Sequence, residues 1–397
     1  MNIPINILQV STTDLIGGAD KIAYNLHGAY QVRGYQSWLT VGRKYTETPG
    51  ILPLPNDASR SVWTRTWLSI EKARLVRPLR KRLRWIGQPG RLLKIRQGHE
   101  DFEFPGIWRI FDLLPRQPDI IHCHNLHGGY FDLRALSWLS QQVPVVLTLH
   151  DGWLLSGHCA HSFDCERWKT GCGYCQDLTI YPSIRRDATA YNWRKKQDIY
   201  SKTKLYVATP SRWLMQRVEQ SILTPAVAEA RIIPSGVDLS IFHSVNGDYK
   251  QGLRAALGIP QDAKVLLYTA TAAGRNPFKD FQTLRAAVSQ VAHRLHEHKI
   301  LFIVLGAVSP AEISERAKIR FIPYQKDSKI VASYYQAADV YTHAAKADTF
   351  PNAVLEAMAC GVPIAATAVG GITEQIKPLR ASAYGLEIDS FGLNCHD

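Results

Sequence analysis

The sequence predicts an α/β protein made of two Rossmann-like domains, each with a parallel sheet wrapped by helices. Short runs rich in β-branched residues alternate with helical patterns along the 397 residues, as expected of parallel strands joined by helices. A first series of such runs is followed by a stretch rich in glycine and then by a second series. No repeat of about 20 to 50 residues is visible, which argues against solenoids and propellers.

The first domain is expected to open with a strand, a glycine-containing loop and a helix, at residues 5–10, 11–18 and 19–32. Its later strands are expected at 37–41, 120–123, 145–149, 205–208 and 231–233, around an insertion at about 45–116 without clear strands. The second domain has candidate strands at 265–269, 300–305, 319–322, 340–343 and 364–366. We place the boundary near residue 245, which gives domains at 1–245 and 246–397. Ligands of this architecture bind in the cleft that faces the carboxyl ends of the strands.

The positive charge of the chain is concentrated in one segment. The sequence carries 47 Lys and Arg against 34 Asp and Glu, a formal charge of +13. Residues 60–96 hold nine Arg and three Lys against the single Glu71, a local charge of +11, so the rest of the chain carries only +2. A uniformly basic surface for nucleic acid is therefore disfavoured, and no nucleic acid partner is expected.

Aromatic and aliphatic side chains interleave with the basic residues of 60–96, among them Trp63, Trp67 and Trp85. Pro78 interrupts any single long helix, so two short helices are expected. Such stretches lie in the interface of anionic lipids, and we expect this segment to contact an anionic membrane surface. The alternative is a basic helix with one solvated face.

The sequence favours a cytoplasmic protein that is peripheral at the inner face of the cell membrane. No apolar run approaches the roughly 18 to 20 residues needed to span a bilayer. The first residues lack the basic region and the cleavage site of a signal peptide. In a reducing compartment the seven cysteines are expected to be thiols or metal ligands before disulfides.

Four of the cysteines lie within 17 residues and end in a Cys-x-x-Cys pair: Cys159, Cys165, Cys172 and Cys175. Four thiolates at close spacing suit a structural zinc ion. The first two lack the Cys-x-x-Cys spacing, so free or redox-sensitive thiols are an equal alternative.

The most informative motif lies at residues 348–374. Asp348 stands just before a helix that Pro351 can open and Gly361 can close. Glu356 lies in the early turns of this helix, on the side that can face Asp348, and two carboxylates so placed can hydrogen-bond several sugar hydroxyls at once. A capping Asp and a solvated Glu would explain each acid separately, but not the Gly-Gly turn that follows at 370–371.

This stretch resembles the donor-binding signature of family 4 glycosyltransferases of the GT-B fold. In that signature an acid, seven residues and a Glu are followed by a strand and a Gly-Gly loop. The family usually has Glu where this chain has Asp348, and Asp348-Thr-Phe-Pro-Asn looks like the variant of enzymes that build bacterial exopolysaccharide and lipopolysaccharide. The resemblance implies a retaining hexosyltransferase that moves a sugar from a nucleotide diphosphate sugar to a lipid-linked or polysaccharide acceptor.

Other positions match the family in the same order along the chain. Gly17 and Gly18 match its glycine loop, where absent side chains let the backbone approach donor phosphate or acceptor. The resemblance gives His150 the role of a residue that contacts the transferred sugar and the acceptor. Without the family match, a satisfied histidine at a strand end would be favoured for His150.

The resemblance also places the groups that hold the diphosphate. Arg275 and Lys279 occupy the position of the family's basic pair, although Phe278 stands where close relatives often have Arg. These cations, with backbone amides at Gly370 and Gly371, would stabilise the leaving diphosphate without a metal or another cofactor.

Glu356 would then hold the ribose and Asp348 the hydroxyls of the donor sugar. No protein nucleophile is identifiable, and the acceptor hydroxyl is expected to attack from the face of the leaving group. Only 23 residues follow Glu374, where the family continues with further strand and helix units, so we expect a shortened C-terminal domain. The competing hypothesis is a catalytically impaired GT-B relative that binds a sugar or a partner in the same cleft.

Overall fold

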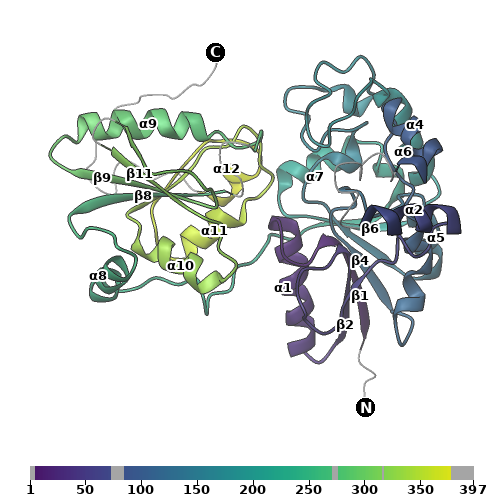
Figure 1. Ribbon diagram of the computed structural model, residues 1–397, viewed down its shortest axis with the longest axis horizontal. Helices are drawn as coiled ribbons and strands as arrows, with labels where there is room; N and C mark the ends of the chain where they lie inside the picture. The colour runs from purple at the N-terminus through teal and green to yellow at the C-terminus, as the bar shows by residue number, and fades with distance from the viewer. Residues whose placement is uncertain (1–4, 73–84, 271–275, 315–316, 377–397) are drawn as a thin grey trace.

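The computed structural model describes residues 5–72, 85–270, 276–314 and 317–376. Two largely parallel sheets lie side by side, each with helices packed against both faces (Figure 1). The expected α/β class and the two Rossmann-like sheets are therefore confirmed. Below, the first half means residues 5–232 and the second half residues 263–376.

The first sheet has seven strands in the order β3-β2-β1-β4-β5-β6-β7, and every neighbouring pair is parallel. The strands are β1 (Asn6–Thr13), β2 (Gln36–Arg43), β3 (Ile51–Pro53), β4 (Ile120–Cys123), β5 (Val145–Thr148), β6 (Leu205–Thr209) and β7 (Val227–Ile232). The helices are α1 (Gly18–Val32), α2 (Val62–Lys72), α4 (Pro89–Arg96), α5 (Ala135–Gln142), α6 (Thr189–Tyr200) and α7 (Arg212–Glu219). The strand order reverses between β1 and β4, which marks the carboxyl edge there as the place for a ligand.

The second sheet has six strands in the order β10-β11-β9-β8-β12-β13, parallel except for the antiparallel pair of β10 and β11. The strands are β8 (Ala263–Thr269), β9 (Lys299–Leu305), β10 (Glu312–Ser314), β11 (Ala317–Ile322), β12 (Val340–His343) and β13 (Ile364–Ala366). The helices are α8 (Gly247–Ala256), α9 (Phe281–Arg294), α10 (Ser328–Ala337), α11 (Asn352–Ala359) and α12 (Ile372–Gln375). Here the order reverses between β8 and β12.

Burial on both faces explains why the central strands read as continuous apolar runs. In β9, six consecutive residues from Ile300 to Leu305 are buried, because helices cover both sides of a parallel sheet. In β1, Leu8 and Val10 are completely buried in the main core of the first half. These buried strands fix the carboxyl edges of the sheets, where the candidate site lies.

The structure differs from the sequence-based expectations in three places. The insertion at 45–116 contains a strand, β3, as well as α2 and α4. The strand expected at 231–233 begins earlier, as β7 at Val227, and β10 was not expected at all. Residue 245, where the domain boundary is expected, lies between β7 and β8, in a stretch that contributes no strand to either sheet. The boundary itself stays a prediction.

Candidate functional site

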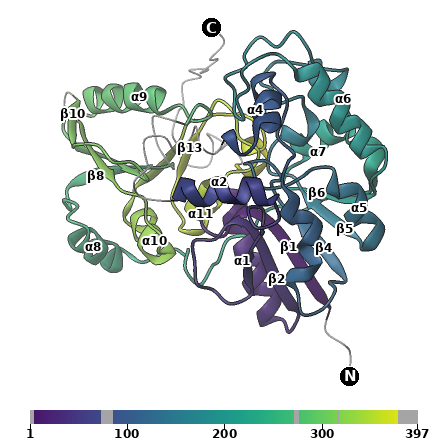
Figure 2. The same ribbon diagram turned by 45° about the vertical axis from the view of Figure 1, so that its right-hand side comes forward.

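Loops at the carboxyl edges of the two sheets contact each other across the gap between the halves. The start of α1, which follows β1, lies beside α11 of the second half (Figure 2). The backbone carbonyl of Gly18 accepts a hydrogen bond from Asn352 Nδ2 at 3.2 Å. The carbonyl of His150, which follows β5, accepts one from Thr349 Oγ1 at 2.7 Å. The residues expected to bind donor and acceptor therefore meet at one cleft.

Asp348, expected to hold the donor sugar, lies in a cluster of polar side chains after β12. Its Oδ2 accepts hydrogen bonds from Lys279 Nζ and from His343 Nε2, the latter at 3.3 Å. Burial alone would raise the pKa of Asp348, but the charge of Lys279 and the hydrogen bond from His343 outweigh it and hold this pKa well below its usual range. Asp348 is thus an ionised acceptor at neutral pH.

Glu356, expected to hold the ribose, already has two partners. Its Oε1 accepts a hydrogen bond from Lys21 Nζ of α1 at 2.8 Å, and its Oε2 accepts one from Tyr335 Oη at 3.1 Å. Lys21 belongs to the first half, so this ion pair bridges the cleft. A ribose hydroxyl would compete with Lys21 for the same carboxylate.

The glycines at 370–371 allow two backbone segments to touch. A Cβ on Gly370 would lie 1.8 Å from the carbonyl oxygen of Asp348, and one on Gly371 would lie 1.8 Å from that of Thr349. The amide of Gly371 donates to the Asp348 carbonyl at 3.3 Å. This close packing, which only glycine permits, brings the loop after β13 to the acidic residue. The following helix, α12, has only four residues, so its dipole is smaller than that of a full helix.

Gly17 and Gly18 open α1 beneath the same cleft. Gly17 has a φ of 115°, a conformation that side chains disfavour. A Cβ on Gly18 would lie 3.6 Å from Asn352 Nδ2 of the second half. The glycine loop therefore lies directly at the junction of the two halves.

A chain of hydrogen bonds runs from the core to the ring of His150. His150 Nε2 lies 3.1 Å from His124 Nδ1, and His124 Nε2 lies 3.2 Å from the side-chain amide of Gln9. The Gln9 amide donates to the carbonyl of Ala23 and accepts from the backbone N–H of His27, since the reverse orientation would oppose donor to donor and acceptor to acceptor. Its nitrogen therefore also donates to His124 Nε2.

This orientation fixes the proton positions on both rings. Burial lowers the pKa of His124 far below its ordinary value and lowers that of His150 to about 4, so both rings are neutral at physiological pH. With Nε2 accepting, His124 carries its proton on Nδ1 and donates it to His150 Nε2. His150 then carries its own proton on Nδ1, which makes that atom a donor and not a base.

Two family descriptions match the chain and together span most of it. Residues 16–241 match "Glycosyltransferase Family 4", and residues 263–385 match "Glycosyl transferases group 1". The chain belongs to glycosyltransferase family 4. The resemblance inferred from the motif at 348–374 is thereby confirmed.

Relatives of this glycosyltransferase include proteins named for colanic acid and teichuronic acid biosynthesis. WcaC of Escherichia coli strain K12, named for colanic acid biosynthesis, is 26% identical over 63% of this chain and 60% of its own. TuaC of Bacillus subtilis strain 168, named for teichuronic acid biosynthesis, is 24% identical over 67% of this chain and 59% of its own. The D-inositol 3-phosphate glycosyltransferase of Mycobacterium avium strain 104 is 31% identical over 63% of this chain and 56% of its own. The chain thus spans about 60% of the length of these relatives.

Solved structures of similar fold are GT-B glycosyltransferases. Sucrose-phosphate synthase from Thermosynechococcus elongatus superposes with a TM-score of 0.58 at 18% identity, over 94% of this chain and 84% of that one. HepE from Anabaena, in complex with UDP-glucose, gives 0.55 at 14% identity, over 94% and 83%. WaaG, a glycosyltransferase involved in lipopolysaccharide biosynthesis, gives 0.55 at 15% identity, over 93% and 82%. The GT-B fold is therefore shown for this glycosyltransferase.

One residue of the predicted diphosphate site, Arg275, lies outside the described residues. Phe278 packs edge-on against His161 of the first half, with ring centroids 4.7 Å apart. Lys279 lies beside Asp348, as described above. The aromatic residue thus fills part of the cleft wall from the second half.

Several residues of the cleft escaped the sequence-based prediction. Lys21 and Gln9 act on partners that are remote in the sequence, and no local pattern marks them. Glu374 accepts hydrogen bonds from the backbone amides of Arg212 and Trp213 at 2.8 and 2.7 Å, and so caps α7 of the other half. His343 ends a buried strand of the sheet, a position at which a polar side chain could have been noticed.

The predicted zinc site is not supported by the structure. Within the described residues, which include Cys159, Cys165, Cys172 and Cys175, no group of three or more His, Cys, Asp or Glu side chains is placed to hold a metal ion. Cys172 Sγ instead accepts from the backbone N–H of Gly157 at 3.3 Å. Burial raises the pKa of Cys172 to about 12 and also raises that of Cys159, so these two are protonated thiols. The prediction rested on cysteine spacing, which says nothing about the directions of the side chains.

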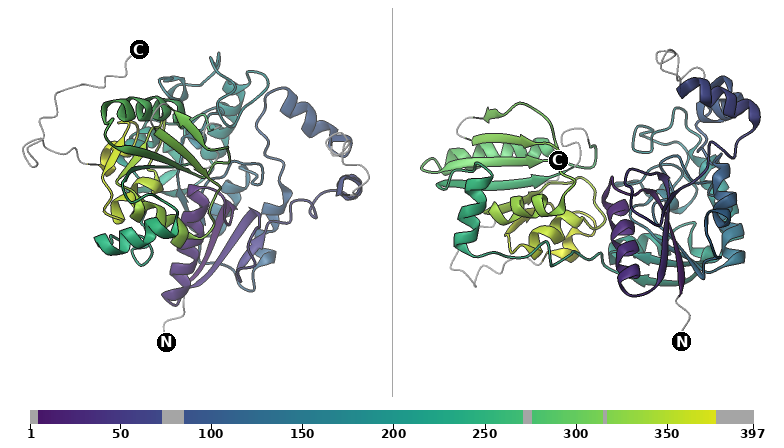
Figure 3. Two further views of the ribbon diagram at one scale, coloured as in Figure 1. Left: turned by 60° about the vertical axis from the view of Figure 1, so that its left-hand side comes forward. Right: turned by 60° about the horizontal axis from the view of Figure 1, so that its bottom comes forward.

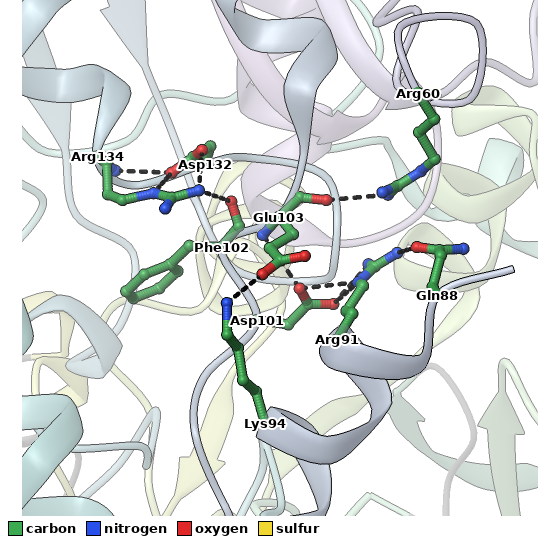
Figure 4. Close-up of polar contacts among 9 residues, drawn as sticks. All are labelled: Arg60, Gln88, Arg91, Lys94, Asp101, Phe102, Glu103, Asp132 and Arg134. Atoms are coloured by element: carbon green, nitrogen blue, oxygen red, sulfur yellow. Dashed lines mark hydrogen bonds and ion pairs between the residues drawn. The ribbon is translucent and has the colours of Figure 1, made fainter. Parts of the chain in front are cut away.

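The described ends of the basic segment are attached to the first half by a network of ion pairs (Figure 4). Arg91 of α4 makes hydrogen bonds with both carboxylate oxygens of Asp101, at 2.5 to 3.0 Å, and one with Gln88. Lys94 pairs with Glu103 at 2.5 Å, and Arg60 donates to the Glu103 carbonyl at 2.9 Å. Several cations of the segment are therefore neutralised locally.

The helix α2 stands out from the body of the first half (Figure 3). Its buried residues Thr64 and Leu68 face inward, whereas Val62 and Trp63 are 69% and 58% exposed. The most basic stretch, residues 73–84, lies outside the described residues. No helix in the described parts of the chain is long and apolar enough to cross a membrane.

Proposed function

We propose that this glycosyltransferase moves a hexosyl group from a nucleotide diphosphate sugar to a lipid-linked or polysaccharide acceptor, with retention of configuration. The proposal is carried by one observation: the segments that carry Asp348, Glu356 and His150 contact each other where the carboxyl edges of the two sheets face each other. An ionised carboxylate, a lysine and a neutral imidazole donor supply hydrogen bonds for sugar hydroxyls and a positive charge for a departing diphosphate. The names of WcaC and TuaC support a role in bacterial surface polysaccharide synthesis.

The proposed roles follow from the positions of the groups. Glu356 binds the ribose after Lys21 releases it, and Lys279 turns from Asp348 to the diphosphate. Asp348 is then free for hydroxyls of the donor sugar. His150 donates Nδ1–H to the transferred sugar or the acceptor. No metal takes part in this scheme.

Transfer of labelled sugar from a panel of nucleotide sugars tests the proposal. We expect Lys279→Ala to lose about a hundredfold or more in kcat/KM, the typical effect of removing a group that contacts developing charge. Glu356→Ala and Asp348→Asn should also lower kcat/KM, because they remove hydrogen bonds to the ribose and to the donor sugar. Lys299→Ala is the matched control, since Lys299 is 73% exposed and pairs with Asp262 on the surface. A folded protein that binds donor but never transfers it would favour the competing binding function.

We also propose that α2 and the basic segment bring this enzyme to an anionic membrane surface at the inner face of the cell membrane. Exposed Val62 and Trp63 on a projecting helix support this role. In sedimentation with vesicles, wild type is expected to bind phosphatidylglycerol and not phosphatidylcholine, and Trp63→Ser with Arg65→Glu is expected to weaken the binding several-fold. Equal binding by this variant and by wild type would refute the role of α2.

A further inference from the structure

A cavity of about 280 Å³ lies between the two halves, beside the carboxylate of Asp348. The second half contributes Asp348, Lys346 and Gly370 to its wall. The first half contributes the start of the loop at residues 159–175, here called the cysteine-rich loop, and one face of α7, including His161 and Arg217. A sugar held by Asp348 would therefore extend within reach of α7.

Arg217 is the most unusual side chain in this wall. Its guanidinium lies over the rings of Trp213 and Trp168, at 4.5 and 5.3 Å, and its Nη1 donates to Ser162 Oγ at 2.7 Å. The buried arginines Arg91 and Arg254 each pair with an aspartate, whereas none of the ion pairs among the described residues includes Arg217. A half-buried guanidinium that lies against two indoles thus makes no ion pair within the described residues, and the nearby Glu166 pairs with Lys169.

The other charged groups around the cavity are either balanced by partners or screened by solvent. Lys346 is a second cation in the wall, and the charge of Asp348 is balanced by Lys279. His161 is neutral at physiological pH, because burial lowers its pKa. Asp164 and Lys346 are both exposed to solvent, where their opposite charges are screened. A single negative charge on a ligand would therefore be stabilised here.

We propose that Arg217 binds a carboxylate on a substrate sugar, so that the donor or the acceptor sugar of this enzyme is a uronic acid or a similar acidic sugar. The proposal rests on the proposed nucleotide-sugar site at Asp348 and adds the chemical class of its substrate. The planar fork of a guanidinium matches the two oxygens of a carboxylate. Stacking on Trp213 and Trp168 limits the orientations of this fork and so reduces the entropy lost on binding.

A purely structural role for Arg217 predicts something different. The hydrogen bond to Ser162 ties α7 to the cysteine-rich loop, and its loss would lower stability and weaken every ligand alike. Recognition of a carboxylate instead changes the ratio of affinities for an acidic sugar and its neutral counterpart. That ratio separates the two roles even if a variant is less stable.

Isothermal titration calorimetry with UDP, UDP-glucose, UDP-glucuronate, UDP-galactose and UDP-galacturonate tests the donor as the source of the carboxylate. Each uronate differs from its hexose only at C6. We expect wild type to bind one uronate at least about tenfold more tightly than the matching hexose, the size of one good charged contact. Arg217→Gln should reduce the ratio to about one and leave the affinity for UDP within about twofold, and Arg217→Lys should retain part of the preference. Arg212→Gln, which removes an exposed arginine of the same helix, should keep the wild-type ratio.

Saturation-transfer NMR with methyl glucuronide and methyl glucoside, in the presence of UDP, tests the acceptor as the source. A preference for the glucuronide that is lost in Arg217→Gln supports the proposal with the carboxylate on the acceptor. The proposal is overturned if neither comparison shows an acidic preference in wild type, or if the preference survives in Arg217→Gln. Nucleotide binding that depends on Lys279, without any acidic preference, would leave the proposed function intact and remove only the role of Arg217. Absence of all nucleotide and sugar binding would overturn both.

Discussion

Replacing Lys196 should destabilise the first half strongly, because this lysine is completely buried. Its Nζ donates to Glu100 Oε1 at 3.0 Å and to the carbonyls of Trp153 and Ser156 at 2.8 and 2.9 Å. Lys196→Met keeps the apolar stem but removes all three hydrogen bonds and leaves the carboxylate of Glu100 buried without its counter-charge. Breaking one side of a buried ion pair costs about 3 to 5 kcal/mol, a factor of roughly 10² to 5 × 10³ in the unfolding equilibrium.

Urea unfolding followed by tryptophan fluorescence measures this effect in the first half alone, because all ten tryptophans lie between Trp38 and Trp213. Lys202→Met is the control: Lys202 pairs with Asp198 on the surface and is 63% exposed, so less than about 1 kcal/mol should be lost. In Lys196→Met, burial without the lysine raises the pKa of Glu100 further above that of the unfolded chain. The loss of stability caused by Lys196→Met should therefore be smaller as the pH falls toward 5 and larger as the pH rises.

The double variant Glu100→Leu with Lys196→Met should recover most of the lost stability, since apolar side chains replace the pair without an orphaned charge. The reasoning fails if Lys196→Met costs less than about 1 kcal/mol or if the double variant is no more stable than Lys196→Met. The same pair holds the backbone that leads into the cysteine-rich loop, so loss of Lys196 should also weaken donor binding.

Three further predictions concern the cleft. Gly371→Ala should destabilise the second half by about 2 kcal/mol or more and abolish donor binding, because its methyl group would overlap a backbone carbonyl; calorimetric unfolding and titration with UDP measure both effects. Lys21→Met should tighten UDP binding up to about fivefold, because a partly exposed ion pair worth about 1 kcal/mol no longer competes for Glu356, and unchanged or weaker binding would contradict this. Gln9→Glu should reverse the donors and acceptors in the chain from Gln9 through His124 to His150 and move the proton of His150 from Nδ1 to Nε2, which the ¹⁵N shifts of the ring report. Because burial lowers the pKa of His150 to about 4, the activity of the wild type should show no step from this ring between pH 5.5 and 8.

Local sequence patterns predicted much of the fold and the residues at the centre of the candidate site. The apolar run of β9 and the spacing from Asp348 to Glu356 with its Gly-Gly turn reflect local constraints, namely burial on two faces and close backbone packing. Strands β3 and β10 were missed because three residues give too short a pattern to detect. The partners of Glu356 and the stacking of Arg217 on two tryptophans depend on residues that the tertiary fold brings together, which the spacing within one segment does not record.

The cap that Glu374 places on α7 makes the position of Arg217 depend on closure of the enzyme. The carboxylate belongs to the second half, whereas the two amides that it holds begin the helix that carries Arg217. If the halves separate, these amides lose their acceptors and exchange with solvent. The rate of hydrogen exchange at the backbone amides of Arg212 and Trp213 therefore measures how often the two halves separate. A ligand that slows this exchange would show closure without any modification of the protein.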